Sequence, residues 1–111
     1  LIRAGRVKAL AVSGTQRSSA LPDVPTVAAT LPGFEAISWY GISVQGGTPR
    51  EVIARINQEV NRVLGTSDMR SRLATEGAEA GGGTPEDFGA FFRAEIDKWA
   101  GVIKAAAIRL E

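Results

Sequence analysis

The sequence predicts an α/β fold with incomplete sheets. Two candidate strands, at residues 7–12 and 36–45, precede three or four helical segments whose apolar residues recur at helical spacing. A sheet of two strands is marginal by itself, and the apolar helix faces need more strand surface than the chain contains. We therefore expect the chain to be one piece of a larger α/β architecture.

The first strand is predicted at residues 7–12, which are apolar on both faces except at Lys8, as in strands covered on both sides. Residues 13–25 are rich in Ser, Gly and Pro and predict a loop. A short helix is expected from Thr26 to Leu31. The second strand is expected at 36–45, where the side chains alternate between two faces.

The second half of the chain carries helix signals. Thr48-Pro49-Arg50-Glu51 has the order of a capping box, and an apolar stripe follows it as far as Gly65. A second helix is predicted from Asp68 to Glu76. Thr84-Pro85-Glu86-Asp87 repeats the capping signal, with Asp87 at the third helical position, and the last helix is expected to end near Ala106.

Composition narrows the class of function. The 111 residues carry 13 Lys and Arg against 12 Asp and Glu, a net charge of +1 that argues against a nucleic-acid partner. The absence of Cys and His removes most metal sites and most nucleophilic mechanisms, although a Ser–Lys dyad or a carboxylate pair stays formally open. No apolar run approaches the roughly 20 residues that span a bilayer. We expect a protein without catalytic residues, metal ligands or cofactor.

The first residues, Leu-Ile-Arg-Ala-Gly, are typical of the last turn of a helix with Gly5 just beyond its end. The chain begins without Met and has no signal peptide, so we expect it to be a fragment.

Two places are candidate ligand contacts. Ser13, Gly14 and Thr15 follow the end of the first strand, where open α/β sheets bind ligands, although an ordinary turn explains them equally well. Trp39 and Tyr40 lie on opposite faces of the second strand, so one of them could line a pocket while core packing is favoured for Trp39.

Other features have simpler explanations. Gly81, Gly82 and Gly83 precede a helix that could bind an anion, but Asp87 would repel phosphate, and a flexible lead into the helix is favoured. The acidic residues of the helices are expected on solvated faces, and the aromatic residues of the last helix in a core. These sets are Glu51, Glu59, Glu86, Asp87, Glu95 and Asp97, and Phe88, Phe91, Phe92 and Trp99.

Several short segments, in one order, resemble the C-terminal third of the Bug, or TctC-like, substrate-binding proteins of tripartite tricarboxylate transporters. The resemblance covers essentially the whole chain. It is carried by Gly-Arg-Val-Lys-Ala-Leu-Ala-Val, Leu-Pro-Asp-Val-Pro-Thr-Val, Leu-Pro-Gly-Phe-Glu, Ser-Trp-Tyr-Gly-Ile, Ile-Ala-Arg-Ile-Asn-Gln-Glu-Val, Arg-Leu-Ala-Thr-Glu-Gly-Ala-Glu and Ala-Glu-Ile-Asp-Lys-Trp.

The resemblance implies part of a two-lobed, type II-like periplasmic binding protein. Residues 1–35 would end the second lobe, 36–46 would cross between lobes as a strand, and 47–111 would complete the first lobe. Such a receptor captures a small organic carboxylate in the cleft between its lobes and delivers it to a membrane permease. Of the ligand contacts, only the loop of residues 13–15 and the Trp39–Tyr40 pair carry over, because the family's other ligand-binding loops are missing here.

Two further possibilities stay open at this stage. An autonomous small α/β interaction or oligomerisation module would enclose its own hydrophobic core within these residues. A homodimer could instead cover open sheet edges and helix faces through intertwined or swapped elements.

Overall fold

The computed structural model describes residues 1–2 and 4–109, and the chain divides into two compact units. Unit 1 consists of Leu1–Tyr40 and Ser67–Ala80, and unit 2 of Gly41–Thr66 together with the residues from Gly81 onward. The first boundary therefore falls inside the predicted crossing segment 36–46.

Unit 1 contains the 3-10 helix η1 (Val27–Ala29) and the helix α2 (Ser67–Thr75). Its one β-type pairing among the described residues is an isolated parallel bridge between Val12 and Thr26. In this bridge the Val12 N–H donates to the Pro25 carbonyl, and the Val27 N–H donates to the Val12 carbonyl, both at 2.9 Å. The loop after the first predicted strand therefore folds back beside the end of that strand.

The two predicted strands are not present as strands among the described residues. Residues 7–12 and 36–45 are neither helical nor part of a ladder, apart from the bridge at Val12. A strand is defined by hydrogen bonds to a neighbour, and residues that could pair with these two segments are not supplied by the described part of the chain. The β component of the predicted α/β fold is thus reduced to a single bridge.

The helix expected from Thr26 to Leu31 is only a single 3-10 turn, η1. Thr26 begins it as expected, since its hydroxyl accepts a hydrogen bond from the Ala29 N–H at 3.2 Å. The turn stops early because Pro32 disfavours helical backbone at the residue before it.

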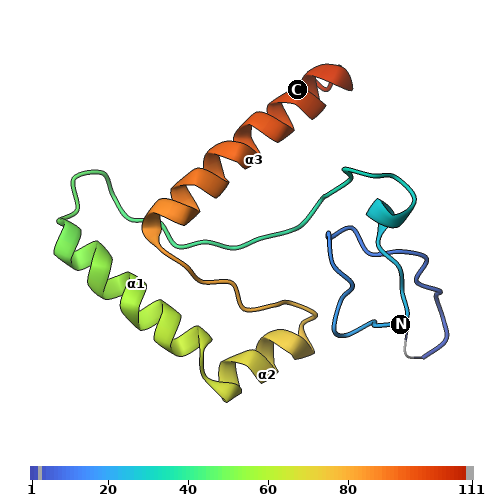
Figure 1. Ribbon diagram of the computed structural model, residues 1–111, viewed down its shortest axis with the longest axis horizontal. Helices are drawn as coiled ribbons and strands as arrows, with labels where there is room; N and C mark the ends of the chain where they lie inside the picture. The colour runs from blue at the N-terminus through green and yellow to red at the C-terminus, as the bar shows by residue number, and fades with distance from the viewer. Residues whose placement is uncertain (3, 110–111) are drawn as a thin grey trace. The chain divides into compact units, whose positions relative to one another are not determined.

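Unit 2 contains α1 (Arg50–Leu64) and α3 (Pro85–Ala105), which contact each other (Figure 1). The capping box predicted for α1 is wrong. Pro49 is the N-cap, with no side-chain cap, and the Thr48 hydroxyl donates instead to the Gln45 carbonyl at 2.7 Å. The hydroxyl that was expected to cap the helix closes the preceding turn.

The capping box predicted for α3 is confirmed. The Asp87 N–H donates to the Thr84 hydroxyl at 3.1 Å, and the Thr84 N–H donates back to the Asp87 carboxylate at 3.0 Å. Pro85 occupies the first helical position, where its missing N–H costs nothing. The capping hydrogen bonds at the start of α3 are therefore all made between residues within four positions of one another.

Two glycines end helical turns in the same way. Gly5, at φ +68°, donates to the Ile2 carbonyl, while the Arg6 N–H donates to the Leu1 carbonyl at 3.1 Å. This pattern is a Schellman motif and confirms the expected place of Gly5, although Arg3 lies outside the described residues. Gly77, at φ +72°, ends α2 with the same pair of bonds.

The end of α3 has the same motif without a glycine. Ala107 stands in the left-handed region at φ 50°, and the Ile108 N–H donates to the Ile103 carbonyl at 3.1 Å. A side chain with a Cβ is strained in this conformation. The helix therefore ends where sequence reasoning expected, near Ala106, but at an energetic cost.

We predict that Ala107→Gly stabilises α3 by about 0.5–1 kcal/mol, because glycine adopts positive φ without strain. Thermal unfolding followed by circular dichroism at the helix band measures the effect. The matched control is Ala100→Gly, which lies inside the helix and should cost about 1 kcal/mol. A loss of stability in Ala107→Gly would contradict the argument.

The apolar side chains on the helices of this chain remain partly exposed to solvent. No hydrophobic side chain of the described residues is buried, and Phe92 and Trp99 are 45% and 41% exposed. The aromatic core expected around α3 is therefore wrong for this chain, since too little apolar surface surrounds these side chains. The closed core expected of an autonomous module is likewise missing from the described residues.

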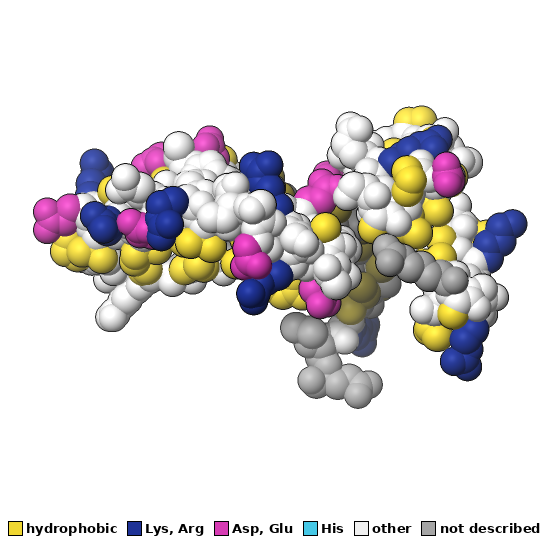
Figure 2. Space-filling model, turned by 90° about the horizontal axis from the view of Figure 1, so that it is seen from below, with side chains coloured by type: hydrophobic (Ala, Val, Ile, Leu, Met, Phe, Trp, Pro, Cys, Tyr) yellow, Lys and Arg dark blue, Asp and Glu magenta, His cyan; other side chains and the backbone are white. Residues whose placement is uncertain are grey.

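Charged and apolar side chains of α1 lie on different sides of the helix (Figure 2). Hydrophobic side chains gather along one side of the left-hand part of Figure 2, which holds α1, and charged side chains lie above them.

Among the described helices, none combines the length and the hydrophobicity that crossing a membrane needs.

Candidate functional site

The loop of Ser13, Gly14 and Thr15 lies beside the beginning of the predicted crossing segment. The Ala36 N–H donates to the Ser13 carbonyl at 3.0 Å. A Cβ on Gly14 would lie 3.7 Å from the Ile37 side chain, so the two segments are in van der Waals contact. Folding thus brings together two stretches that are separated by more than twenty residues, both within unit 1.

The side chains of this loop are open to solvent. Ser13 and Thr15 are exposed, and Gly14 is half-buried. Two hydroxyls and neighbouring main-chain N–H groups can donate to a carboxylate, because an anion accepts such bonds more strongly than a neutral group. The loop therefore offers neutral donors for an anionic ligand and no charge of its own.

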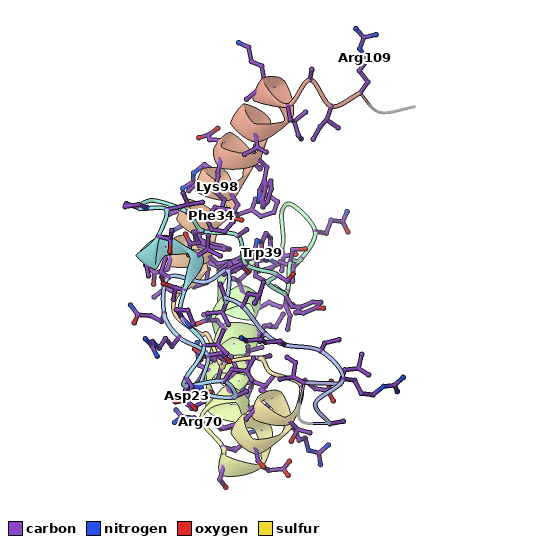
Figure 3. All side chains as sticks on the ribbon, turned by 90° about the vertical axis from the view of Figure 1, so that its right-hand side faces the viewer. Asp23, Phe34, Trp39, Arg70, Lys98 and Arg109 are labelled. Carbon is purple, nitrogen blue, oxygen red and sulfur yellow. The ribbon has the colours of Figure 1, made fainter. Side chains whose placement is uncertain are left out.

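Trp39 and Tyr40 differ sharply in their surroundings. Trp39, which is labelled in Figure 3, is half-buried, whereas Tyr40 is 97% exposed. This difference agrees with alternation of side chains along an extended segment. Along the chain, Tyr40 is the last residue of the first segment of unit 1, and Gly41 begins unit 2.

Arg17, two residues after Thr15, has a hydrogen bond to the main chain. Its guanidinium donates to the Pro22 carbonyl at 2.9 Å, within the loop of residues 13–25. The described residues also hold no group of three or more acidic side chains that could bind a metal ion.

The glycine segment before α3 is held by α1. The Gly83 N–H donates to the Asn61 side-chain carbonyl at 3.1 Å. The Gly83 carbonyl accepts from the amides of Asn57 and Asn61, at 2.9 and 3.0 Å. The expected flexible lead into the helix is therefore a fixed connection, and the anion site considered there is filled by the chain's own groups.

Sequence reasoning missed this Asn57–Asn61 clamp. The available signal was the spacing of the two residues, four apart on a helix, which places both side chains on one face. Their partner is a main-chain group more than twenty residues away, which no local pattern specifies.

Both the backbone conformation and the nearby Asn61 side chain favour glycine at position 82. Its φ is +121°, and a Cβ built on it would lie 2.7 Å from the Asn61 side-chain oxygen. A larger residue would therefore strain the backbone and push against the clamp at the same position.

We predict that Gly82→Ala lowers the stability of unit 2 by about 1–3 kcal/mol, the cost of one strained backbone position. Gly81→Ala is the matched control, because Gly81 has no heavy atom within 4 Å of a built Cβ and no positive φ. Thermal unfolding by circular dichroism should separate the two variants. Equal midpoints would show that the clamp does not restrict this segment.

The Asp87 carboxylate belongs to the capping box of α3. The Thr84 hydroxyl and then the Thr84 N–H donate to it, and these bonds hold the pKa of Asp87 below its ordinary value of 3.8. Asp87 therefore stays ionised at the positive end of the helix dipole.

This pKa shift predicts a loss of stability in acid. Because the pKa is lower in the folded chain than in the unfolded one, the stabilisation is complete above about pH 5 and disappears as the pH falls through the folded pKa. The thermal midpoint of wild type should exceed that of Asp87→Asn near neutral pH, and the difference should shrink toward about pH 2. A difference that stays constant over this range would contradict the argument.

Glu95 is not on a solvated face as expected, since it is 7% exposed. Its Oε2 accepts from the Trp99 indole N–H at 3.0 Å, and its Oε1 is ion-paired with Lys98, a residue of the same helix that Figure 3 labels. The Lys98 ammonium also lies 5.6 Å from the centre of the Trp99 ring. This cluster pairs Lys98 with a carboxylate, whereas a Ser–Lys dyad would need a hydroxyl beside it.

Comparison with known families decides the class of the protein. The family described as "Tripartite tricarboxylate transporter family receptor" (TctC) matches residues 1–108. The chain belongs to this receptor family. The TctC family comprises substrate-binding receptors, which agrees with the expectation of a protein that is not an enzyme.

Individual relatives support the assignment to the TctC family. A protein from a Pseudomonas species, "UPF0065 protein in tcbD-tcbE intergenic region", is 40% identical over 92% of this chain. Protein BugT of Bordetella pertussis is 32% identical over 99% of it. The solved structure "R. palustris Rpa4515 with adipate" superposes with a TM-score of 0.80 at 38% identity over 96% of this chain.

These TctC relatives are much longer than this chain. It spans about a third of each, namely 31% of the Pseudomonas protein, 34% of BugT and 36% of the R. palustris chain. The chain therefore has part of the fold of a ligand-binding receptor.

Proposed function

We propose that this chain is the C-terminal part of an extracytoplasmic solute receptor that captures a small organic carboxylate and delivers it to a membrane permease. The observation that carries the proposal is the match of residues 1–108 to the tripartite tricarboxylate receptor family. The R. palustris protein was solved with adipate, a dicarboxylate, which supports a carboxylate as the ligand class. On this proposal the receptor acts in the periplasm, where it meets its permease.

The proposed cleft lies between two lobes. Residues 1–35 would end one lobe and 47–111 would complete the other, with 36–46 crossing between them. The boundary between Tyr40 and Gly41 falls within this crossing segment and supports it. The helix α2, which groups with unit 1, would belong to the lobe of residues 47–111 on this proposal.

The proposed ligand contacts are Ser13, Gly14, Thr15 and the Trp39–Tyr40 pair. Two exposed hydroxyls and an open tyrosine ring give neutral hydrogen-bond donors and an aromatic wall. A neutral site of this kind binds a carboxylate through several hydrogen bonds rather than through one buried ion pair. Ligand binding in both lobes would then favour the closed form of the receptor.

This proposal predicts that adipate stabilises the full-length receptor but does not bind the 111-residue chain. A half-cleft lacks the contacts in the other lobe, so its affinity should be negligible. Thermal-shift measurements with a panel of di- and tricarboxylates test the receptor, and calorimetry tests the isolated chain. Micromolar binding by the isolated chain would overturn the two-lobed arrangement.

Substitutions in the receptor test the individual contacts. Ser13→Ala and Thr15→Val each remove one hydroxyl and should weaken carboxylate binding about tenfold, the value of one hydrogen bond to a charged group. Ser19→Ala, at an exposed position in the same loop, is the control. If all three variants bind like wild type, the loop of residues 13–15 is not the ligand site.

The isolated chain is also predicted to form a homodimer that covers its open helix faces. Its 45% exposed Phe92 and 41% exposed Trp99 are the kind of side chain that a second copy would cover. Sedimentation velocity measures this directly, and a monomer at all concentrations would contradict it.

A further inference from the structure

Gly41 lies against the edge of the Phe88 ring. A Cβ built on Gly41 would lie 2.7 Å from Phe88 Cε2 and 3.2 Å from Cε1, and closer still to Cζ. Real Cβ atoms essentially never approach a ring carbon at less than 3.0 Å. The main chain at Gly41 is thus in direct contact with α3, inside unit 2.

Space alone requires glycine at this position. The φ of Gly41 lies outside the left-handed region, so a larger residue could adopt the same backbone conformation. Gly41 therefore differs from Gly82 and Gly83, whose positive φ also favours glycine. The contact with Phe88 is what a side chain would disrupt.

The Phe88 ring also has two aromatic neighbours on its own helix. Phe88 begins the second turn of α3, and its N–H donates to the Thr84 carbonyl at 3.1 Å, directly behind the capping box. Its ring centre lies 6.5 Å from that of Phe91 and 6.1 Å from that of Phe92. Two rings of the same helix thus lie beside Phe88, while Gly41 lies against its outer edge.

The position of this contact along the chain suggests its role. Gly41 is the first residue of unit 2, and the exposed Tyr40 directly before it belongs to unit 1. We infer that the Gly41–Phe88 contact is a pivot: it anchors the crossing segment to α3, so that bending on lobe closure is confined to residues before Gly41. This inference rests on the proposed receptor function.

The test uses four variants of the full-length receptor. Gly41→Ala should displace the crossing segment and raise the dissociation constant for adipate at least about tenfold. Gly46→Ala is the matched control, because Gly46 lies on the same segment with no heavy atom within 4 Å and no positive φ. Phe88→Leu alone should also raise the dissociation constant, by less than Gly41→Ala, because it removes the ring atoms that face Gly41. The double variant Gly41→Ala with Phe88→Leu should recover most of the affinity, since the shorter side chain leaves room for the Cβ.

Hydrogen exchange measured without ligand tests the pivot independently of the proposed receptor function. Gly41→Ala should speed exchange at the Phe88 N–H, which donates to the Thr84 carbonyl, about tenfold, and neither Gly46→Ala nor the double variant should do so. Equal exchange in Gly41→Ala and Gly46→Ala overturns the pivot, whatever the receptor binds. Wild-type receptor that binds no carboxylate overturns the proposed function, and the exchange data then still decide the pivot.

Small-angle scattering with and without adipate completes the test. A pivot predicts that Gly41→Ala changes the compaction of the receptor on ligand binding. If this variant lowers only the thermal midpoint, and compaction and affinity match wild type, then the contact is ordinary packing and the inference is wrong.

Discussion

The hydrogen bonds at the start of α3 hold unit 2 together. Thr84 and Asp87 close the first turn of the helix, and the side-chain amides of Asn57 and Asn61 bind the residue before it. These bonds join α1 and α3, the pair of described helices that contact each other. They matter more than usual here, because no hydrophobic side chain of the described residues is buried and packing contributes little.

On the proposed function, this chain is part of a receptor that moves between an open and a closed form. In such a receptor a ligand favours the closed form only through contacts that the open form lacks, so each half of the proposed cleft would contribute part of the binding energy. The neutral loop of residues 13–15 and the exposed Tyr40 are suited to such a partial contribution. Firm anchoring at Gly41 would complement it, because a segment that is fixed at one end transmits movement at the other.

Prediction from sequence succeeded where the interacting residues are neighbours. The α3 capping box and the left-handed Gly5 were predicted correctly, because each depends on residues within a few positions. The cap expected at Thr48 failed although its pattern was equally good, since the hydroxyl found the Gln45 carbonyl instead. Glu95 was misassigned for a related reason: its burial depends on what surrounds α3, while the spacing to Lys98 and Trp99 was visible in the sequence.

By itself, the sequence determined the three α-helices, the polar loop after residue 12 and the receptor family, because periodicity, caps and ordered short segments are properties of adjacent residues. Only the tertiary structure decided that Asn57 and Asn61 hold Gly83, that Gly41 lies against Phe88, and that residues 7–12 and 36–45 form no ladder in the described part of the chain. These outcomes depend on which distant atoms come within reach of one another, and a local pattern of side chains does not specify that distance.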